Sequence, residues 1–162
     1  IGGYWYHDGT PSDNTVGNIY ADVALWGTSD GPYARWRVRR MNRPDGQSGD
    51  TIGEGDFTTP VNLGTPYTLY ISYNESENRL TFRFGAEEVT FGEGQGLPPR
   101  AGYAYNPVKG LGTRMVIDDA NSEGYISATF DNVWVNGVPY DDFSSPTIDP
   151  ARWIDSEFVR EI

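Results

Sequence analysis

Apolar and polar residues alternate with a period of two through much of this chain, and that period predicts β-strands. Residues 17–27 place apolar side chains at every second position, at Ile19, Ala21, Val23 and Leu25. Residues 33–41 alternate Ala34, Trp36 and Val38 on one face with Arg35, Arg37 and Arg39 on the other. The turn-forming sequence TSDGP at 28–32 separates the two segments. They are therefore predicted to form a hairpin of antiparallel strands.

A second hairpin is predicted over residues 66–84, with its turn in NESEN at 74–78. The strand before the turn alternates Tyr67, Leu69, Ile71 and Tyr73, and the returning strand alternates Leu80, Phe82 and Phe84. A turn near Gly85 and Ala86 leads into another short strand that ends at residue 92. Residues 92–110 are rich in Gly and Pro and are predicted to form a long loop.

The remaining segments extend the same pattern to both ends of the chain. Further strands are predicted at 1–7, 111–118 and 124–137 and, after a lead-out turn, at 156–162. IDPARW at 148–153 predicts a single helical turn, with Asp149 as N-cap and Pro150 at the first helical position. With roughly nine or ten strands and no other helix, the chain is predicted to be all-β, a two-sheet antiparallel sandwich or jelly roll.

The amino-acid composition and net charge exclude several classes of binding partner and of chemistry. The net charge of −11 disfavours nucleic acid and anionic membranes, which both need basic surface. No apolar run approaches the ~20 residues that span a bilayer, so no membrane insertion is expected. The absence of Cys excludes disulfides and thiolate chemistry. The polar make-up, rich in Gly, Asn and Asp, favours an extracellular or cell-surface location.

Two segments resemble parts of the concanavalin A-like jelly rolls, the lectin/glucanase and laminin-G-like group. YISATFDNVWVNG at 125–137 resembles the closing strand of these domains, whereas DDFSSPTIDPARWIDSEFVREI at 141–162 resembles their opening. IGGYWYHDGT at 1–10 resembles a mid-domain strand. The resemblance implies a jelly-roll body at 1–139 that lacks its opening strands. It also implies that 140–162 is the opening segment of a next copy or of a neighbouring subunit.

This order allows three arrangements: a repeat cut out of phase from a tandem array, a subunit whose C-terminal strand completes its neighbour, or a circular permutation in which that strand folds back. A sandwich without its opening strand exposes unpaired backbone groups, which an added strand satisfies. The partners expected are copies of the same chain, head to tail. The predicted contact residues are Phe143, Trp153, Phe158, Val159 and Ile162.

Catalytic signals are weak. Laminarinase-type enzymes of the fold that the chain resembles carry three carboxylates as E-x-D-x-x-E on one strand. The nearest match here is Glu54 and Asp56, with Thr59 where the acid/base would stand. His7, beside Asp8, is the only histidine, so a transition-metal site is not expected and a polar strand end near a turn is favoured. The chain is predicted not to be an enzyme.

Calcium is the expected cofactor, in a structural role. In the jelly rolls that the chain resembles, the Asp of the closing strand contributes to a Ca²⁺ site, and the matching position is Asp131. Asp118 and Asp119 lie in an acidic turn and form a second candidate, with an ordinary solvated hairpin as the alternative.

Aromatic and Arg side chains on one sheet suggest a surface for glycans. The candidates are Trp5, Trp26, Trp36, Arg35, Arg37 and Arg39, and the Arg row suits uronate or sulfate groups. The alternative is that the aromatic residues pack in the core and that the Arg row pairs with acids such as Asp22.

Together these patterns predict a non-enzymatic structural or adhesive unit of a repetitive surface protein or filament. A carbohydrate-binding module of a secreted polysaccharide-active protein is the alternative. The third hypothesis is a glycoside hydrolase or lyase with degenerate motifs.

Overall fold

The computed structural model describes residues 1–46, 48–115 and 126–154. The chain divides into two compact units, Ile1–Gly112 and Thr113–Ile162, which we call unit 1 and unit 2. All described sheets are antiparallel, with five, three and two strands, so the prediction of an all-β chain is confirmed. The concanavalin A-like assignment stays a prediction, and so does the role of 140–162 as the opening of another copy.

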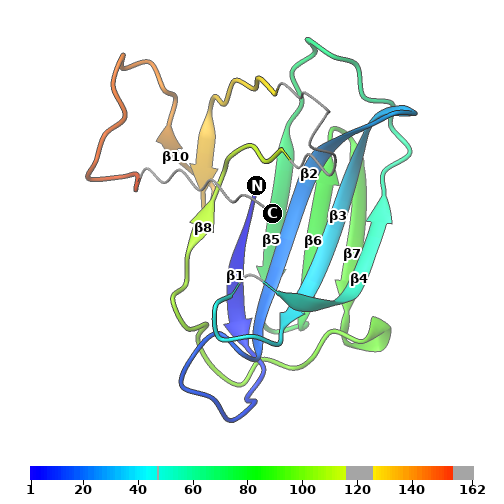
Figure 1. Ribbon diagram of the computed structural model, residues 1–162, viewed down its shortest axis with the longest axis vertical. Coiled ribbons are helices and arrows are strands. Elements are labelled where there is room, and N and C mark those ends of the chain that lie inside the picture. Colours follow the sequence, from blue (N-terminus) through cyan, green and yellow to red (C-terminus); the bar gives the residue numbers. More distant parts are fainter. Residues whose placement is uncertain (47, 116–125, 155–162) are drawn as a thin grey trace, which may run out of the picture. The chain divides into compact units, whose positions relative to one another are not determined.

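Unit 1 contains a five-stranded sheet in the order β4-β3-β2-β1-β8 (Figure 1). Its strands are β1 (Gly2–His7), β2 (Asn18–Thr28), β3 (Gly31–Met41), β4 (Gly49–Asp56) and β8 (Lys109–Gly110). The pairing of β2 with β3 runs without interruption from Ile19 and Arg40 to Thr28 and Gly31. The first predicted hairpin is therefore confirmed.

The second sheet of unit 1 has the order β5-β6-β7, with strands β5 (Leu69–Asn74), β6 (Arg79–Phe84) and β7 (Glu87–Gly92). The turn between β5 and β6 spans residues 75–78, and residues 85–86 connect β6 to β7. Both turns lie where the sequence predicts them. The short 3-10 turn η1 (Glu93–Gln95) opens the segment that was predicted to be an irregular loop.

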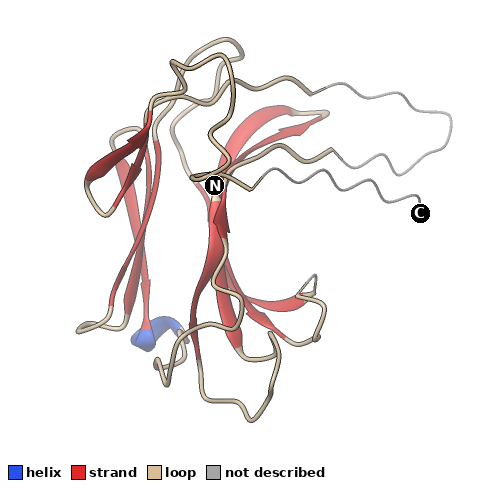
Figure 2. Cartoon of the chain, turned by 90° about the vertical axis from the view of Figure 1, so that its left-hand side faces the viewer, coloured by secondary structure: helices blue, strands red, loops and turns tan. Residues whose placement is uncertain are grey.

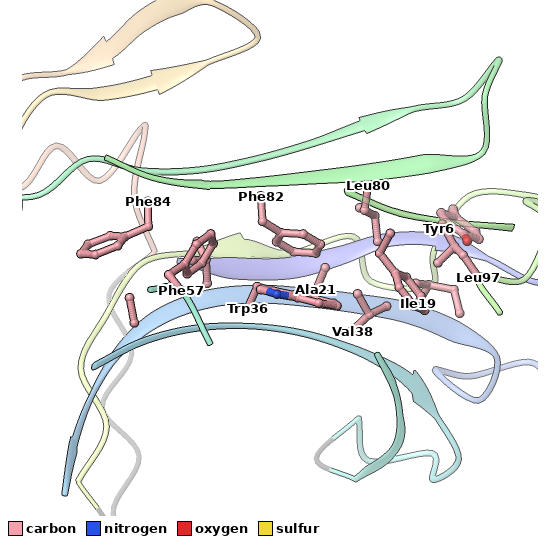
Figure 3. Packing of buried hydrophobic residues seen from close by; sticks show 13 residues of the cluster. Tyr6, Ile19, Ala21, Trp36, Val38, Phe57, Leu80, Phe82, Phe84 and Leu97 are labelled. Atoms are coloured by element: carbon pink, nitrogen blue, oxygen red, sulfur yellow. The ribbon is translucent and has the colours of Figure 1, made fainter. Parts of the chain in front are cut away.

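The two sheets of unit 1 lie face to face, and the hydrophobic core fills the space between them (Figures 2 and 3). The centre of the core is aromatic, since Trp36 of β3 stacks on Phe82 of β6 with ring centroids 5.2 Å apart. The inward side chains are the ones that the period of two predicts: Ile19, Ala21, Val23, Trp36, Val38, Leu80, Phe82 and Phe84. Leu25 is an exception, because it is exposed towards the end of β2.

Side chains of β1 and β2 hold the segment 97–108 in place through hydrogen bonds to its backbone. The Tyr6 hydroxyl donates to the Pro98 carbonyl at 2.5 Å. The buried Asn18 amide donates to the Tyr105 carbonyl at 2.7 Å, and its oxygen accepts from the Tyr105 amide at 2.9 Å. These bonds lead the chain back to β8, which pairs with β1.

In the described part of unit 2, β9 (Val133–Val135) and β10 (Val138–Asp141) form a hairpin. Asn136 and Gly137 form its turn with positive φ at both residues, as a type I′ hairpin turn requires. The strands predicted at 111–118 and 124–137 are mostly not observed, because the described residues 111–115 and 126–132 have no strand conformation. Within the described parts of these two predicted strands, only residues 133–135 pair with a neighbouring strand, which is β10.

After β10, unit 2 closes a small aromatic cluster around Trp153. The Trp153 ring lies 5.3 Å from those of both Tyr140 and Phe143, and its indole N–H donates to the Asp141 carboxylate at 2.6 Å. The Asp149 carbonyl accepts from the Trp153 amide at 3.0 Å, and its carboxylate caps the Ala151 amide at 2.9 Å. The predicted single turn with Asp149 as its cap is thus present.

Candidate ligand-binding face

The face of the five-stranded sheet that points away from the core carries charged and aromatic side chains. We call it the outer face and define it by Tyr4, Tyr20, Asp22, Trp26, Tyr33, Arg35, Arg37, Arg39, Glu54 and Asp56. These positions alternate with buried ones such as Ala21, Val23 and Trp36. The period of two that builds the core therefore also gathers these side chains on one surface.

Two β-bulges set which residues reach the outer face. In β1 the register shifts between Tyr4, which pairs with Tyr20, and Tyr6, which pairs with Ile19. Trp5 is the extra residue, so Tyr4 lies beside outer Tyr20 while Tyr6 is buried in the core. The register between β3 and β4 also shifts, because Val38 pairs with Gly53 but Arg39 pairs with Thr51. Ile52 of β4 is the extra residue there.

Ion pairs occupy the centre of the outer face. Arg35 Nε donates to Asp56 at 2.6 Å, and Arg35 Nη1 lies 3.7 Å from Glu54. Arg37 Nε donates to Asp22 at 3.2 Å, and its second nitrogen completes a forked contact at 3.3 Å. The alternative interpretation of the Arg row, pairing with Asp22 across strands, is correct for Arg37.

The pKa of Asp56 follows from this pairing. The hydrogen bond from Arg35 lowers the pKa of the Asp56 carboxyl and outweighs its slight desolvation, and the Arg35 charge adds to the effect. Asp56 therefore stays ionised at neutral pH and has no proton to give as a general acid. Thr59, at the position of the missing acid/base, donates its hydroxyl to Glu87 at 3.0 Å.

Each guanidinium of the Arg row also covers an aromatic ring. The distances from the guanidinium carbon to the ring centroid are 5.4 Å for Arg35 on Tyr33, 5.5 Å for Arg37 on Trp26 and 4.8 Å for Arg39 on Tyr20. Trp26 and Tyr33 stack with centroids 6.5 Å apart. The outer face thus alternates rings and cations, an arrangement that holds flat rings at fixed positions.

Two candidate glycan residues do not belong to this set. Trp36 lies in the core and is 8% exposed, because it alternates with the Arg row and points to the opposite face of β3. Its inclusion in a glycan site is thereby corrected. Trp5 packs against the core cluster, and the Lys109 ammonium lies 4.7 Å above its ring.

His7 and Asp8 order the turn after β1. His7 Nε2 contacts the Val16 carbonyl at 2.8 Å, and Nδ1 accepts from the Gly9 amide at 3.0 Å. This pattern suits the tautomer with the proton on Nε2. Asp8 accepts from the Thr10 amide at 2.9 Å and pairs with Arg40. The interpretation of His7 as a polar strand end near a turn agrees with these contacts.

Asp8 should make unit 1 sensitive to acid. Burial raises the pKa of its carboxyl, but the bonds from Thr10 and Arg40 together outweigh burial and hold the pKa below the ordinary 3.8. A lowered folded-state pKa stabilises above the unfolded-state pKa, and this stabilisation is lost as the pH falls through the folded-state value. Asp8→Asn should lower stability at pH 7 by about 1.5 kcal/mol and flatten its decline below about pH 4. Urea titrations at a series of pH values measure both effects, and an unchanged acid slope would contradict them.

The calcium candidates all belong to unit 2. Asp131 is exposed, and its carboxylate accepts from the Asn132 amide at 2.8 Å. Within the described ranges, no three His, Asp or Glu side chains are grouped so that they could hold a metal ion. Asp118 and Asp119 lie outside the described residues. Calcium binding stays a prediction.

The predicted polymer contacts are also only partly described. Phe143 and Trp153 pack on each other within unit 2, while Phe158, Val159 and Ile162 lie outside the described residues. A hollow of about 220 Å³ beside the hairpin is lined by residues that include Trp134, Tyr140, Asp142 and Arg152. It is smaller than the roughly 300–1,000 Å³ of most small-molecule sites.

Sequence reasoning missed several members of the outer face. Tyr33 is not among the candidates predicted from the sequence, and Glu54 and Asp56 are considered there only for catalysis. The alternation along the strand could have revealed Tyr33, because it lies an even number of residues from Arg35, Arg37 and Arg39 and so points to the same face.

Comparisons with protein-family models, curated proteins and solved structures found no significant match to this chain. A search of the described residues also found no helix with the length and apolar character needed to cross a membrane.

Proposed function

We propose that this protein is a non-enzymatic carbohydrate-binding module whose outer face binds a glycan. One observation carries the proposal: Tyr20, Trp26 and Tyr33 are half-buried on the outer face of one sheet, and each has a guanidinium against its ring. Sugar rings present C–H faces that pack on aromatic rings, and hydroxyl groups that bond to charged groups beside them. Both kinds of partner occur side by side here.

The sheet suits binding because its side chains are already held in place. Arg35 and Arg37 are fixed by Asp56 and Asp22, so little side-chain freedom remains to be lost when a ligand binds. Positions on strands are also more rigid than positions on loops. The acid/base carboxylate that hydrolysis requires is missing at the nearest catalytic match, where Thr59 donates its hydroxyl to Glu87, and Arg35 contacts both Asp56 and Glu54.

Binding to immobilised and soluble polysaccharides tests the proposal, with laminarin, agarose, polygalacturonate and κ-carrageenan as probes. Trp26→Ala should weaken the binding of the preferred polysaccharide at least tenfold, about 1.4 kcal/mol. The control Trp134→Ala removes an exposed indole from unit 2 and should leave affinity unchanged. Absence of binding to every probe, or equal binding by Trp26→Ala and the parent protein, would overturn the proposal.

A second candidate is a structural or adhesive unit that assembles head to tail on a cell surface or in the extracellular space. It is favoured by the apolar side chains exposed in unit 2, where Trp134 is 61% and Ile154 is 94% exposed. An isolated two-stranded hairpin such as β9–β10 is marginally stable, and its edges accept an added strand. In this scheme residues 140–162 of one copy add to the next. Sedimentation of the full chain and of a variant ending at Pro139 should then show polymers only for the full chain.

A further inference from the structure

We propose that Arg39 is the anion-binding position of the outer face and selects glycans that carry carboxylate or sulfate groups. This inference rests on the proposed carbohydrate-binding function and specifies its ligand class. It concerns the end of the face where Arg39 lies beside Tyr4 and Tyr20.

Arg39 is the one arginine of the five-stranded sheet without a carboxylate partner among the described residues. Arg35 pairs with Glu54 and Asp56, Arg37 with Asp22, and Arg40 with Asp8. The chain has 23 acidic and 12 basic residues, so counter-ions are plentiful. An unpaired guanidinium in such a chain is available for an anion from outside.

The two tyrosines beside Arg39 do not neutralise its charge. Burial raises the pKa of the Tyr20 hydroxyl, and the nearby Asp22 raises it further, which outweighs the opposite effects of Arg39 and Arg37. Burial likewise raises the pKa of Tyr4 against the effect of Arg39, and the nearby Asp45 carboxylate raises it further. Both phenols therefore stay protonated at neutral pH, and neither supplies a negative charge.

The position of the guanidinium is partly fixed. It lies 4.8 Å above the Tyr20 ring, and Tyr4 packs edge-on against the same ring at 5.6 Å. Arg39 Nε is buried and has no hydrogen-bond partner among the described residues. A planar guanidinium that is held against a ring can donate two parallel hydrogen bonds to two oxygens of a carboxylate or sulfate group. The flexible ammonium group of a lysine fits this geometry less well.

The rest of the outer face explains why the anion belongs to a glycan. At the centre, Asp22, Glu54 and Asp56 balance Arg35 and Arg37, so a second anion gains little there. Tyr33 lies six residues before Arg39 on β3, about 20 Å away at roughly 3.3 Å per residue. An extended sugar chain can therefore lie across the rings with one charged group at Arg39.

The experiment compares acidic glycans with uncharged counterparts of the same backbone. Oligogalacturonate is paired with its methyl ester, and κ-carrageenan oligosaccharide with its desulfated form, by isothermal titration calorimetry at low ionic strength. The parent protein should bind the acidic form of at least one pair tenfold or more tightly than its counterpart. The pair that shows the preference distinguishes carboxylate from sulfate. About 0.5 M NaCl should reduce the preference, because salt screens exposed charges.

Arg39→Gln should abolish the preference, and Arg39→Lys should restore part of it. The matched control is Arg83→Gln, which removes a guanidinium that also lies over a ring, that of Tyr70 at 5.0 Å, but is paired with Glu88. This control should keep the full preference.

Each contrary result has a distinct meaning. An unchanged preference in Arg39→Gln overturns the inference and leaves the carbohydrate-binding proposal standing, as does an equal loss in Arg83→Gln, which would point to net charge alone. Competition by inorganic sulfate at the same concentration as the oligosaccharide also overturns it, because Arg39 would then hold an adventitious ion only. If neither form of either pair binds and the neutral probes also fail, the proposed function itself fails.

Discussion

Replacing Trp36 with alanine should lower the free energy of unfolding of unit 1 by about 3–5 kcal/mol. Trp36 is 8% exposed, stacks on Phe82 at 5.2 Å and contacts Phe91 at 5.8 Å between ring centroids. Truncation removes the ring that joins β3 to β6 and β7 and leaves a cavity between the sheets. Denaturant unfolding followed by far-ultraviolet circular dichroism measures the loss.

The backbone of β4 packs directly against the rings of Trp36 and Phe91, so there is no room for a side chain at Gly53 or Gly55. A Cβ atom on Gly55 would lie 2.8 Å from Trp36 Nε1, and one on Gly53 would lie 2.6 Å from the Phe91 ring. Leu63→Ala, at an 88% exposed position, is the control and should change stability by less than about 0.5 kcal/mol. If Trp36→Ala costs no more than Leu63→Ala, the described core is wrong.

Replacing Asn18 with leucine should cost about 3 kcal/mol, although the new side chain is similar in size and more apolar. Asn18 is fully buried and satisfies both backbone groups of Tyr105, as donor at 2.7 Å and as acceptor at 2.9 Å. Leucine leaves both groups without a partner, at about 1–3 kcal/mol each. Thermal and denaturant unfolding measure the loss.

Limited proteolysis can distinguish the loss of the hydrogen bonds that hold the loop 98–108 from a general loss of stability. In Asn18→Leu, protease cleavage within residues 98–108 should become faster under native conditions, before the rest of unit 1 unfolds. Asn42→Leu is the matched control, because the Asn42 amide bonds only to the exposed Asp50 at 2.7 Å in the described structure. Faster cleavage in both variants, or in neither, would contradict the assigned role of Asn18.

The features that could be predicted from the sequence are the local ones. The hairpins at 18–41 and 69–84 were predictable because alternation and turn residues lie in one short segment. Strand β10 was missed even though Asn136 and Gly137 between Val135 and Val138 are a strong hairpin signal. The resemblance to a closing strand directed attention to 124–137 as one continuous strand instead.

The features that could not be predicted depend on pairing between distant segments. The contact of Arg35 with Asp56 depends on the register between β3 and β4, and the bulge at Ile52 of β4, opposite Val38 and Arg39, shifts that register. The pairing of β8 with β1 joins residues more than a hundred positions apart, and no local pattern indicates it. Trp36 is different, because its alternation with the Arg row already placed it on the opposite face.

The pairing of β1 with β8 also has a mechanical consequence. Gly2 pairs with Gly110 and Gly3 with Lys109, so the chain on either side of this ladder leaves from the same end. Tension applied between Ile1 and Gly112 would load these hydrogen bonds one after another, as in opening a zipper, and not all together as in sliding two strands apart. We therefore expect β8 to peel away at low force and to uncover the edge of β1 that carries Tyr4.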